Sequence, residues 1–242
     1  YVDYINRQLF GGNTVASLRG GNNFAFGGAR IVTDAEDAIP DLSLQITSFQ
    51  ATRPVSARAG GLYILNAGGN DIFALGRHAD KDPDALAPFP SPEAYTQAIV
   101  DQYVGAVTRL NGLGARNILI TGIPNSNVQL ARDIDAVLQS RLASLPLAEG
   151  TTLYRYSYIS FFDRLQSDPA SLGLPPLRTD KGCIELNAQS RDCKGIFTFD
   201  GTHPTAAVQR ALFRDIQNQF GIASVPEPES WAMMIAGFAM AG

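Results

Sequence analysis

The chain has 242 residues, of which 45% are hydrophobic and 17% are charged, and its formal net charge is −4 at pH 7. This length suits one α/β domain with a sizeable core, and the composition is that of a globular rather than a disordered protein. Because the net charge is weakly acidic and no basic cluster is present, the sequence argues against a nucleic-acid partner and against binding to anionic lipid.

The first residues, Tyr1–Leu9, have the pattern of an amphipathic helix. They contain no basic segment followed by a long apolar run, as a signal peptide would, and no initiator methionine. We therefore expect the natural polypeptide to begin earlier.

A glycine block follows in Asn22–Arg30, with the sequence Asn-Asn-Phe-Ala-Phe-Gly-Gly-Ala-Arg. Paired glycines allow a sharp turn that presents backbone N–H groups to a ligand. A plain tight turn is the alternative. A dinucleotide-binding motif fits poorly, because the spacing is not G-x-G-x-x-G and no strand precedes it.

Three short apolar runs predict strands at 61–66, 117–121 and 152–156. Helical patterns lie between and after these strands. One follows the cap Ser91-Pro92-Glu93, a second spans about 127–145, a short one spans 159–165, and the last begins at Pro204. The inward-facing positions expected on these helices are Tyr95, Ile99, Tyr103, Val107, Leu110, Ile134, Val137, Leu138, Leu142, Val208, Leu212 and Ile216. Strands that alternate with helices of this length predict a parallel sheet covered on both faces.

Between the first predicted strand and the helix that follows Ser91 lies a long segment, Leu75–Pro90, which is rich in Pro, Asp and Ala. It predicts a solvated insertion in preference to a lid over a binding site.

A second glycine block, Ala67-Gly68-Gly69-Asn70-Asp71, comes directly after the first predicted strand. In an open α/β sheet the ligand site lies beyond the carboxyl ends of the strands. The side-chain amide of Asn70 is therefore a candidate donor to a developing oxyanion. The alternative is a structural turn with Asn70 in the left-handed region. A calcium-binding β-roll would require tandem repeats, and this block occurs once.

The third block contains Asp200 and His203, three residues apart on a loop that enters the last helix. Such a carboxylate can hold one imidazole nitrogen and leave the other as a general base. A purely structural histidine is the alternative.

Cys183 and Cys193 are the only cysteines. Their close spacing suits a local disulfide, and two unrelated reduced thiols are equally compatible with it. A metal site is not expected, since zinc requires about four ligands and neither His78 nor His203 has ligand spacing with these thiols.

Taken together and in this order, the three blocks resemble those of the GDSL (SGNH) hydrolase family, in particular its secreted lipase/esterase branch. The resemblance implies a three-layer α/β/α, flavodoxin-like domain over residues 1–221 and no cofactor. It implies that the Gly28 N–H and the Asn70 amide bind the oxyanion, that His203 is the general base, and that Asp200 orients it.

The family's first block, Gly-Asp-Ser with the nucleophilic serine, has no counterpart in the chain. Ser17, Ser43 and Ser56 lack its strand-to-helix surroundings. We expect the serine to lie upstream of Tyr1, and we expect the chain as it stands to have little or no hydrolase activity.

The C-terminal residues 222–242 comprise a Pro-Glu-Pro linker and the apolar run Trp231–Gly242, which is too short for a bilayer span of roughly 20 residues. They resemble a PEP-CTERM sorting signal, although the usual closing arginines are absent. The resemblance implies export in a Gram-negative bacterium, membrane tethering and processing by a sorting machinery. Export in turn favours the Cys183–Cys193 disulfide.

The sequence thus predicts a hydrolase of carboxylic esters, with a small-molecule or lipid substrate. The alternative is a non-catalytic surface or matrix-binding protein on the same scaffold. A nucleotide-binding module receives little support, because the chain has no P-loop.

Overall fold

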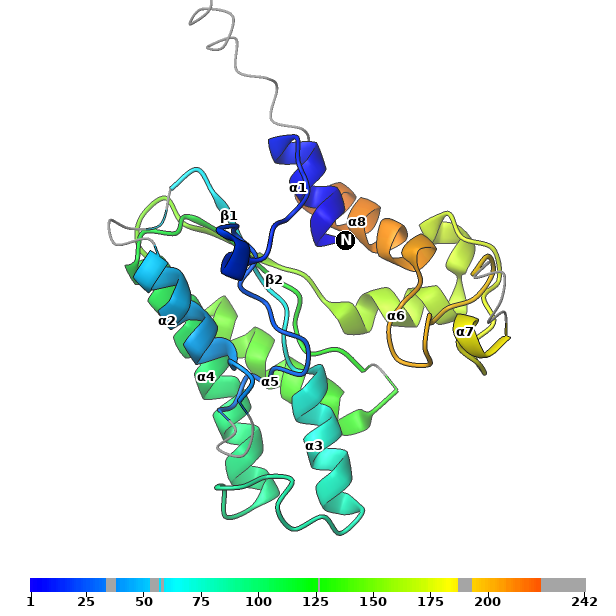
Figure 1. Cartoon of the computed structure of the whole chain (residues 1–242), viewed down its shortest axis with the longest axis horizontal. Helices are drawn as coiled ribbons and strands as arrows, with labels where there is room; N and C mark the ends of the chain where they lie inside the picture. The colour runs from blue at the N-terminus through cyan, green and yellow to red at the C-terminus, as the bar shows by residue number, and fades with distance from the viewer. Residues whose placement is uncertain (34–37, 53–56, 58, 126, 187–192, 223–242) are drawn as a thin grey trace, which may run out of the picture. The chain divides into compact units, whose positions relative to one another are not determined.

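The computed structural model describes residues 1–33, 38–52, 57, 59–125, 127–186 and 193–222 (Figure 1). Contacts divide the chain into two compact units. The sheet unit comprises residues 16–164, and the terminal unit comprises residues 1–15 and 165–242.

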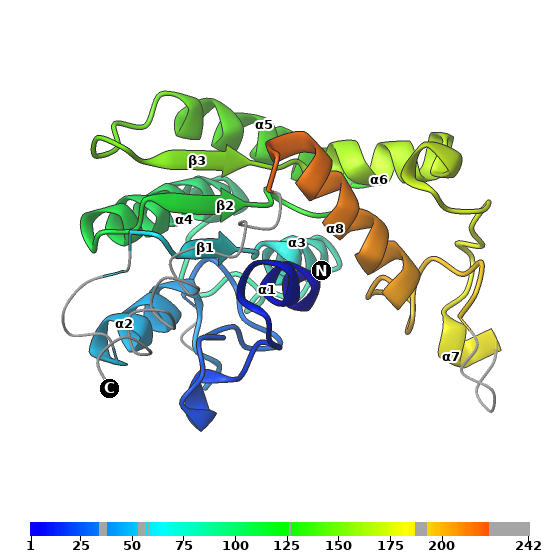
Figure 2. The same cartoon turned by 90° about the horizontal axis from the view of Figure 1, so that it is seen from above.

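The sheet unit contains three parallel strands, β1 (Leu62–Leu65), β2 (Asn117–Ile120) and β3 (Thr152–Arg155), in the order β1-β2-β3 (Figure 2). All three coincide with predicted strands. Tyr63 pairs with Ile118, and Ile118 pairs with Leu153, so these three side chains share one face of the sheet.

Helices α4 (Pro92–Gly112) and α5 (Gln129–Ala143) lie against this sheet, and α2 (Leu42–Thr52) packs on α4 (Figures 1 and 2). The start of α4 is as predicted, because the Ser91 hydroxyl accepts a hydrogen bond from the Ala94 N–H and a proline occupies the first turn. Helix α2 was not predicted from the sequence.

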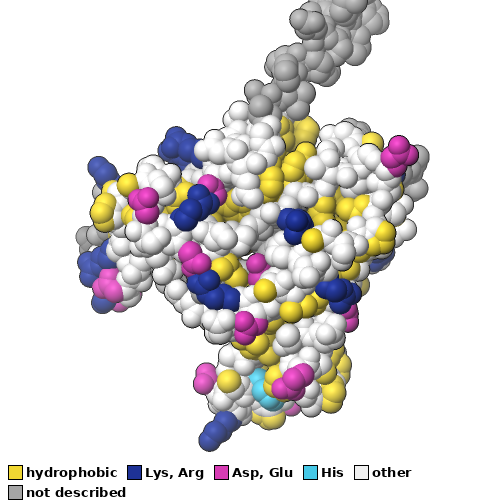
Figure 3. Space-filling model, turned by 180° about the vertical axis from the view of Figure 1, so that it is seen from behind, with side chains coloured by type: hydrophobic (Ala, Val, Ile, Leu, Met, Phe, Trp, Pro, Cys, Tyr) yellow, Lys and Arg dark blue, Asp and Glu magenta, His cyan; other side chains and the backbone are white. Residues whose placement is uncertain are grey.

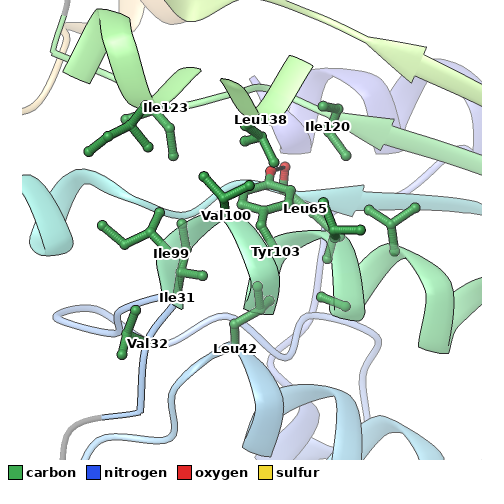
Figure 4. Packing of buried hydrophobic residues seen from close by; sticks show 14 of the residues in the cluster. Ile31, Val32, Leu42, Leu65, Ile99, Val100, Tyr103, Ile120, Ile123 and Leu138 are labelled. Atoms are coloured by element: carbon green, nitrogen blue, oxygen red, sulfur yellow. Dashed lines mark hydrogen bonds between the residues drawn. The ribbon is translucent and has the colours of Figure 1, made fainter. Parts of the chain in front are cut away.

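The hydrophobic core lies between these helices and the sheet (Figure 4). Tyr103 is fully buried there, and its hydroxyl donates to the Leu65 carbonyl over 3.0 Å, which satisfies the polar end of the ring. Labelled residues of the core come from the strands, from the helices, from the loop after the first glycine block and from the loop after β2: Ile31, Val32, Leu42, Leu65, Ile99, Val100, Ile120, Ile123 and Leu138.

The prediction that Val137 faces inward is wrong. Its side chain is 51% exposed and borders a surface hollow of about 150 Å³ between α4 and α5. The buried stripe of α5 instead runs through Ala131, Ile134, Leu138 and Leu142. At 3.6 residues per turn, Val137 lies roughly 110° around the helix from the centre of that stripe.

The prediction that Leu75–Pro90 is a solvated insertion holds for most of the segment, whose residues are exposed or half-buried, but not for all of it. Helix α3 (Gly69–Ala79) continues through its first five residues, and Leu75, Ala85 and Leu86 are buried. Helix α3 begins within the glycine block itself. Because glycine has a low helix propensity, the two glycines did not indicate that a helix starts there.

In the terminal unit, α1 (Val2–Phe10) packs against α8 (Ala206–Phe220). The rings of Tyr4 and Phe213 stack with centroids 5.7 Å apart, and the Arg210 guanidinium lies 5.6 Å from the centroid of the Tyr4 ring. Helix α8 starts two residues after Pro204, because Thr205 is its N-cap and donates from both its N–H and its hydroxyl to the preceding strand-like segment.

The remaining helices are short. Helix α6 (Tyr158–Ser167) begins in the sheet unit and ends in the terminal unit, and α7 (Cys183–Leu186) precedes the third predicted block. Two 3₁₀ turns, η1 (Ser17–Arg19) and η2 (Pro169–Leu172), complete the described elements.

Charged side chains of both signs are interspersed over the face shown in Figure 3, where neither sign gathers into one field. No described helix combines the length and the hydropathy needed to cross a membrane. The linker and apolar run predicted to form a sorting signal lie outside the described residues, except for Ile222.

Candidate active site

Strand β1 leads into α3 through Gly68, which has a left-handed φ of 116°. A Cβ atom at this position would lie 2.9 Å from the Ile123 side chain and 3.3 Å from that of Ile31. Only glycine both adopts this left-handed conformation readily and lacks the Cβ atom that would collide with these side chains. The sharp turn places Asn70 and Asp71 in the first turn of α3. Asn70 is therefore helical, and the alternative of a left-handed structural turn at Asn70 does not hold.

The structure brings the two predicted oxyanion-binding residues together in the sheet unit. The Asn70 Nδ2 donates to the Ala29 carbonyl over 2.8 Å, which ties α3 to the residue that follows Gly28. Gly28 itself is exposed, with a φ of 87°, and a Cβ there would lie 2.7 Å from the Ile39 side chain. The side-chain amide of Asn70 has two N–H donors. One of them makes this bond, which fixes the orientation of the amide, and the second donor remains.

Asp71 was not singled out by the sequence analysis, yet it anchors the same loop. Its carboxylate accepts hydrogen bonds from the Ile31 N–H over 2.9 Å, the Val32 N–H over 3.2 Å and the Tyr95 hydroxyl over 3.3 Å. The residue is completely buried. A signal for it was present in the sequence, since Asp71 and Leu75 are four residues apart and therefore on one face of α3.

A second buried carboxylate, that of Asp41, accepts from the Arg30 N–H over 2.8 Å, while the Leu42 N–H donates to the Arg30 carbonyl. The loop after Gly28 is therefore held by two acidic side chains through its backbone. Because the donors are backbone N–H groups, these hydrogen bonds fix the path of the chain but do not require particular side chains along it.

At about pH 4, we expect Asp71→Ala to lower the free energy of unfolding by an amount on the order of 3 kcal/mol, because two buried backbone donors lose their acceptor. Urea unfolding followed by circular dichroism measures this. Asp101→Ala is the matched control. That carboxylate pairs with Arg141 on the surface, and its loss is expected to cost about 0–1 kcal/mol. Equal effects of the two variants would contradict the anchoring role.

The stability that depends on Asp71 should also change with pH. Burial raises the pKa of this carboxyl from 3.8 to about 6, against the opposing effect of the Ile31 and Val32 N–H groups. Because the pKa in the folded state is higher than in the unfolded state, its contribution is fully present below 3.8 and is lost as pH rises through about 6. Relative to Asp71→Ala, the wild type should lose roughly 3 kcal/mol between about pH 4 and pH 7. A constant difference between the two proteins would contradict this.

In the terminal unit, Asp200 and His203 form the predicted pair. The His203 Nδ1 lies 2.8 Å from the Asp200 Oδ2, and the His203 and Thr202 N–H groups donate to the other carboxylate oxygen over 2.8 and 3.1 Å. The His203 N–H, the His203 ring and the Thr202 N–H hold the pKa of Asp200 well below its usual range. The carboxylate is thus ionised and oriented on the imidazole.

The ring of His203 is accessible, since 76% of its side-chain surface is exposed. With Nδ1 directed at the carboxylate, Nε2 is the nitrogen left for a proton transfer. The four predicted site residues therefore form two pairs, Gly28 with Asn70 in the sheet unit and Asp200 with His203 in the terminal unit.

Ser17, Ser43 and Ser56 were not predicted to be the nucleophile, and the structure shows where the first two lie. Ser17 begins η1, where its N–H donates to the Asn23 carbonyl, and Ser43 lies in α2 with its hydroxyl 3.2 Å from that of Thr33. Ser56 lies outside the described residues.

The expected disulfide between Cys183 and Cys193 is confirmed. Among the residues that the structure describes, no three His, Cys, Asp or Glu side chains gather as ligands for a metal ion.

The family model of the GDSL-like lipases/acylhydrolases matches residues 1–216. The chain belongs to this family. No curated protein matches the chain. The match spans all four predicted site residues of this GDSL-like protein and extends from α1 into α8. Together with the parallel sheet and its helices, it confirms the predicted α/β class and is consistent with the three-layer α/β/α, flavodoxin-like architecture.

Proposed function

We propose that this GDSL-like protein hydrolyses carboxylic esters, with His203 as the general base. The observation that carries the proposal is the pairing of the His203 Nδ1 with the Asp200 Oδ2 over 2.8 Å, beside an exposed ring. This arrangement sets the tautomer in which Nε2 accepts a proton. The ionised Asp200 stabilises the imidazolium that results.

In the proposed reaction a serine hydroxyl oxygen attacks the ester carbonyl carbon, and the His203 Nε2 takes the serine proton. The Gly28 N–H and the Asn70 amide stabilise the oxyanion of the tetrahedral intermediate. His203 then returns the proton to the alkoxide that leaves as an alcohol. Water, activated by the same imidazole, hydrolyses the acyl-enzyme and restores the serine. We place this serine in a Gly-Asp-Ser segment upstream of Tyr1.

We further propose that the protein is exported and belongs to the secreted branch of the family, with its C-terminal residues acting as a PEP-CTERM-like signal for a sorting machinery. The Cys183–Cys193 disulfide supports this, because such bonds persist mainly in oxidising compartments. Mass spectrometry of the protein from fractionated cells tests it. A reduced, full-length protein found in the cytosol would contradict it.

The test of the enzymatic proposal uses the natural, full-length protein and its 242-residue part. Both are incubated with p-nitrophenyl acetate, butyrate and octanoate, and separately with a fluorophosphonate that labels nucleophilic serines. We expect ester turnover and labelling of one serine in the natural protein, and neither in the 242-residue part. A natural protein that hydrolyses no ester and takes up no label would favour the non-catalytic, surface- or matrix-binding alternative.

A further inference from the structure

The turn that carries Asp200 and His203 is supported by the segment 178–186, which runs beside residues 193–199. Four backbone hydrogen bonds of 2.9–3.0 Å join the two segments: Arg178 N–H to the Gly195 carbonyl, Phe197 N–H to the Arg178 carbonyl, Cys183 N–H to the Thr198 carbonyl and Ile184 N–H to the Phe199 carbonyl. The last two reach the residues immediately before Asp200.

Gly182 is in direct contact with the backbone of the turn. A Cβ atom at this position would lie 2.6 Å from the Gly201 nitrogen, 2.9 Å from the Asp200 carbonyl carbon and 3.1 Å from the Asp200 Cα. These are backbone atoms, so no side-chain rotation relieves the contact. The main chain at Gly182 therefore sets the position of the main chain at Asp200.

The disulfide adds a covalent bond between the same two segments. Cys183 follows Gly182, has a completely buried side chain and is bonded to Cys193, at the start of the segment that leads to Asp200. The Ile196 N–H donates to the Cys193 carbonyl, which continues the connection toward the turn. The sulfur–sulfur bond thus joins the two segments covalently within a few residues of the contact at Gly182.

The charged side chains of the supporting segment pair with one another. Arg178 contacts Asp180 over 2.7 Å, and Lys181 contacts Glu185 over 2.8 Å. Their charges are thereby largely compensated locally. The support given to Asp200 is consequently one of backbone position.

We propose that Gly182 and the Cys183–Cys193 disulfide form a brace that keeps the Asp200 carboxylate aligned on His203, so that the alignment of this pair depends on the oxidation state of the two cysteines. The functional consequence rests on the proposed role of His203 as general base. The alignment itself does not.

A dithiol can reduce the Cys183–Cys193 disulfide. The reagent donates two electrons and two protons, Cys183 and Cys193 become thiols, and the dithiol becomes a cyclic disulfide. With the covalent link gone, the backbone hydrogen bonds still join the two segments, but no bond between side chains of residues 183 and 193 does. We expect the Asp200 carboxylate to lose its fixed position and the imidazole to lose its preference for a proton on Nδ1.

The tautomer of His203 is a readout that a merely structural effect elsewhere would not move. Long-range ¹H–¹⁵N spectra of the ¹⁵N-labelled protein, recorded where the imidazoles are neutral, distinguish a proton on Nδ1 from one on Nε2. The chain has only two histidines, so His78→Gln completes the assignment. In the oxidised protein we expect the His203 proton on Nδ1. After reduction, and in the double variant Cys183→Ser/Cys193→Ser, we expect it to shift largely to Nε2.

Gly182→Ala tests the brace with the disulfide intact and should produce the same shift. Gly12→Ala is its matched control, because a Cβ at Gly12 meets only one side-chain atom at 3.9 Å, and it should change nothing. The His78 signals, from the sheet unit, report whether that part of the protein stays folded in every sample that retains His78. In the natural protein, reduction should lower the turnover number roughly ten- to a hundredfold with little change in KM.

The outcomes separate the brace from the proposed function. If Asp200→Asn moves the proton to Nε2 while reduction and Gly182→Ala leave it on Nδ1, the brace is wrong and the pair stands. If Asp200→Asn has no effect on the His203 tautomer, the pair itself is wrong, and with it the proposed general base.

Discussion

His203→Ala is expected to lower the turnover number of a protein that carries the proposed nucleophilic serine by roughly 10⁴-fold or more, because that serine loses the proposed base for its proton. The imidazole acts twice in the proposed cycle, once for the serine and once for the water, so no single step compensates for its loss. Steady-state hydrolysis of p-nitrophenyl butyrate measures the effect. Asp200→Asn should follow with a loss of about 10⁴-fold, because the imidazole would no longer be held in the tautomer that accepts a proton on Nε2.

His78→Ala is the control for this experiment, since it removes the other histidine of the chain, at the end of α3. We expect it to leave the turnover number unchanged. If His203→Ala retained a tenth or more of the wild-type turnover number, another group would have to be the base.

Asn70→Ala is expected to lower the turnover number of the natural protein by roughly 10²–10³-fold, equivalent to about 2.7–4 kcal/mol, with a much smaller change in substrate affinity. The reason is that an oxyanion exists only after attack on the carbonyl, so its donor acts on the transition state more than on the bound ester. The bond from Asn70 to the Ala29 carbonyl orients the amide before the substrate arrives.

Asn117→Ala provides a matched comparison. Asn117 also donates from Nδ2 to a backbone carbonyl, that of Ala59, but it lies at the amino end of β2, away from the edge of the sheet to which α3 connects. Its loss should leave both kinetic constants unchanged. A rise in KM alone for Asn70→Ala would count against the oxyanion role, because it would indicate lost ground-state binding.

The strands and the longer helices could be predicted from sequence because their signals are local. A run such as Leu62–Leu65 is apolar and bounded by glycine, and α4 has a capping serine, a proline in the first turn and apolar residues at helical spacing. Likewise, Asp200 and His203 lie three residues apart, so a single turn brings them together. Asn70 was indicated by its position directly after a predicted strand, and Gly28 by the resemblance to the GDSL family.

Features that depend on contacts between distant segments were not predictable in this way. Asp71 accepts from residues about 40 positions earlier in the chain, and no local pattern specifies those partners. The contact of Gly182 with Asp200 has the same character. Val137 was misassigned because apolar residues on a helix do not reveal where the buried stripe ends, which the neighbouring helix decides.

The loop that presents Gly28 continues directly into Ile31 and Val32, which are 0% and 1% exposed in the core. Adaptation of this protein is therefore constrained at that point. A substitution that widened the proposed oxyanion-binding site by moving this loop would have to displace core side chains, and large changes there typically cost about 2–5 kcal/mol. Variants selected for new ester substrates should accordingly retain Ile31 and Val32 and accumulate their changes in segments that carry no such anchor.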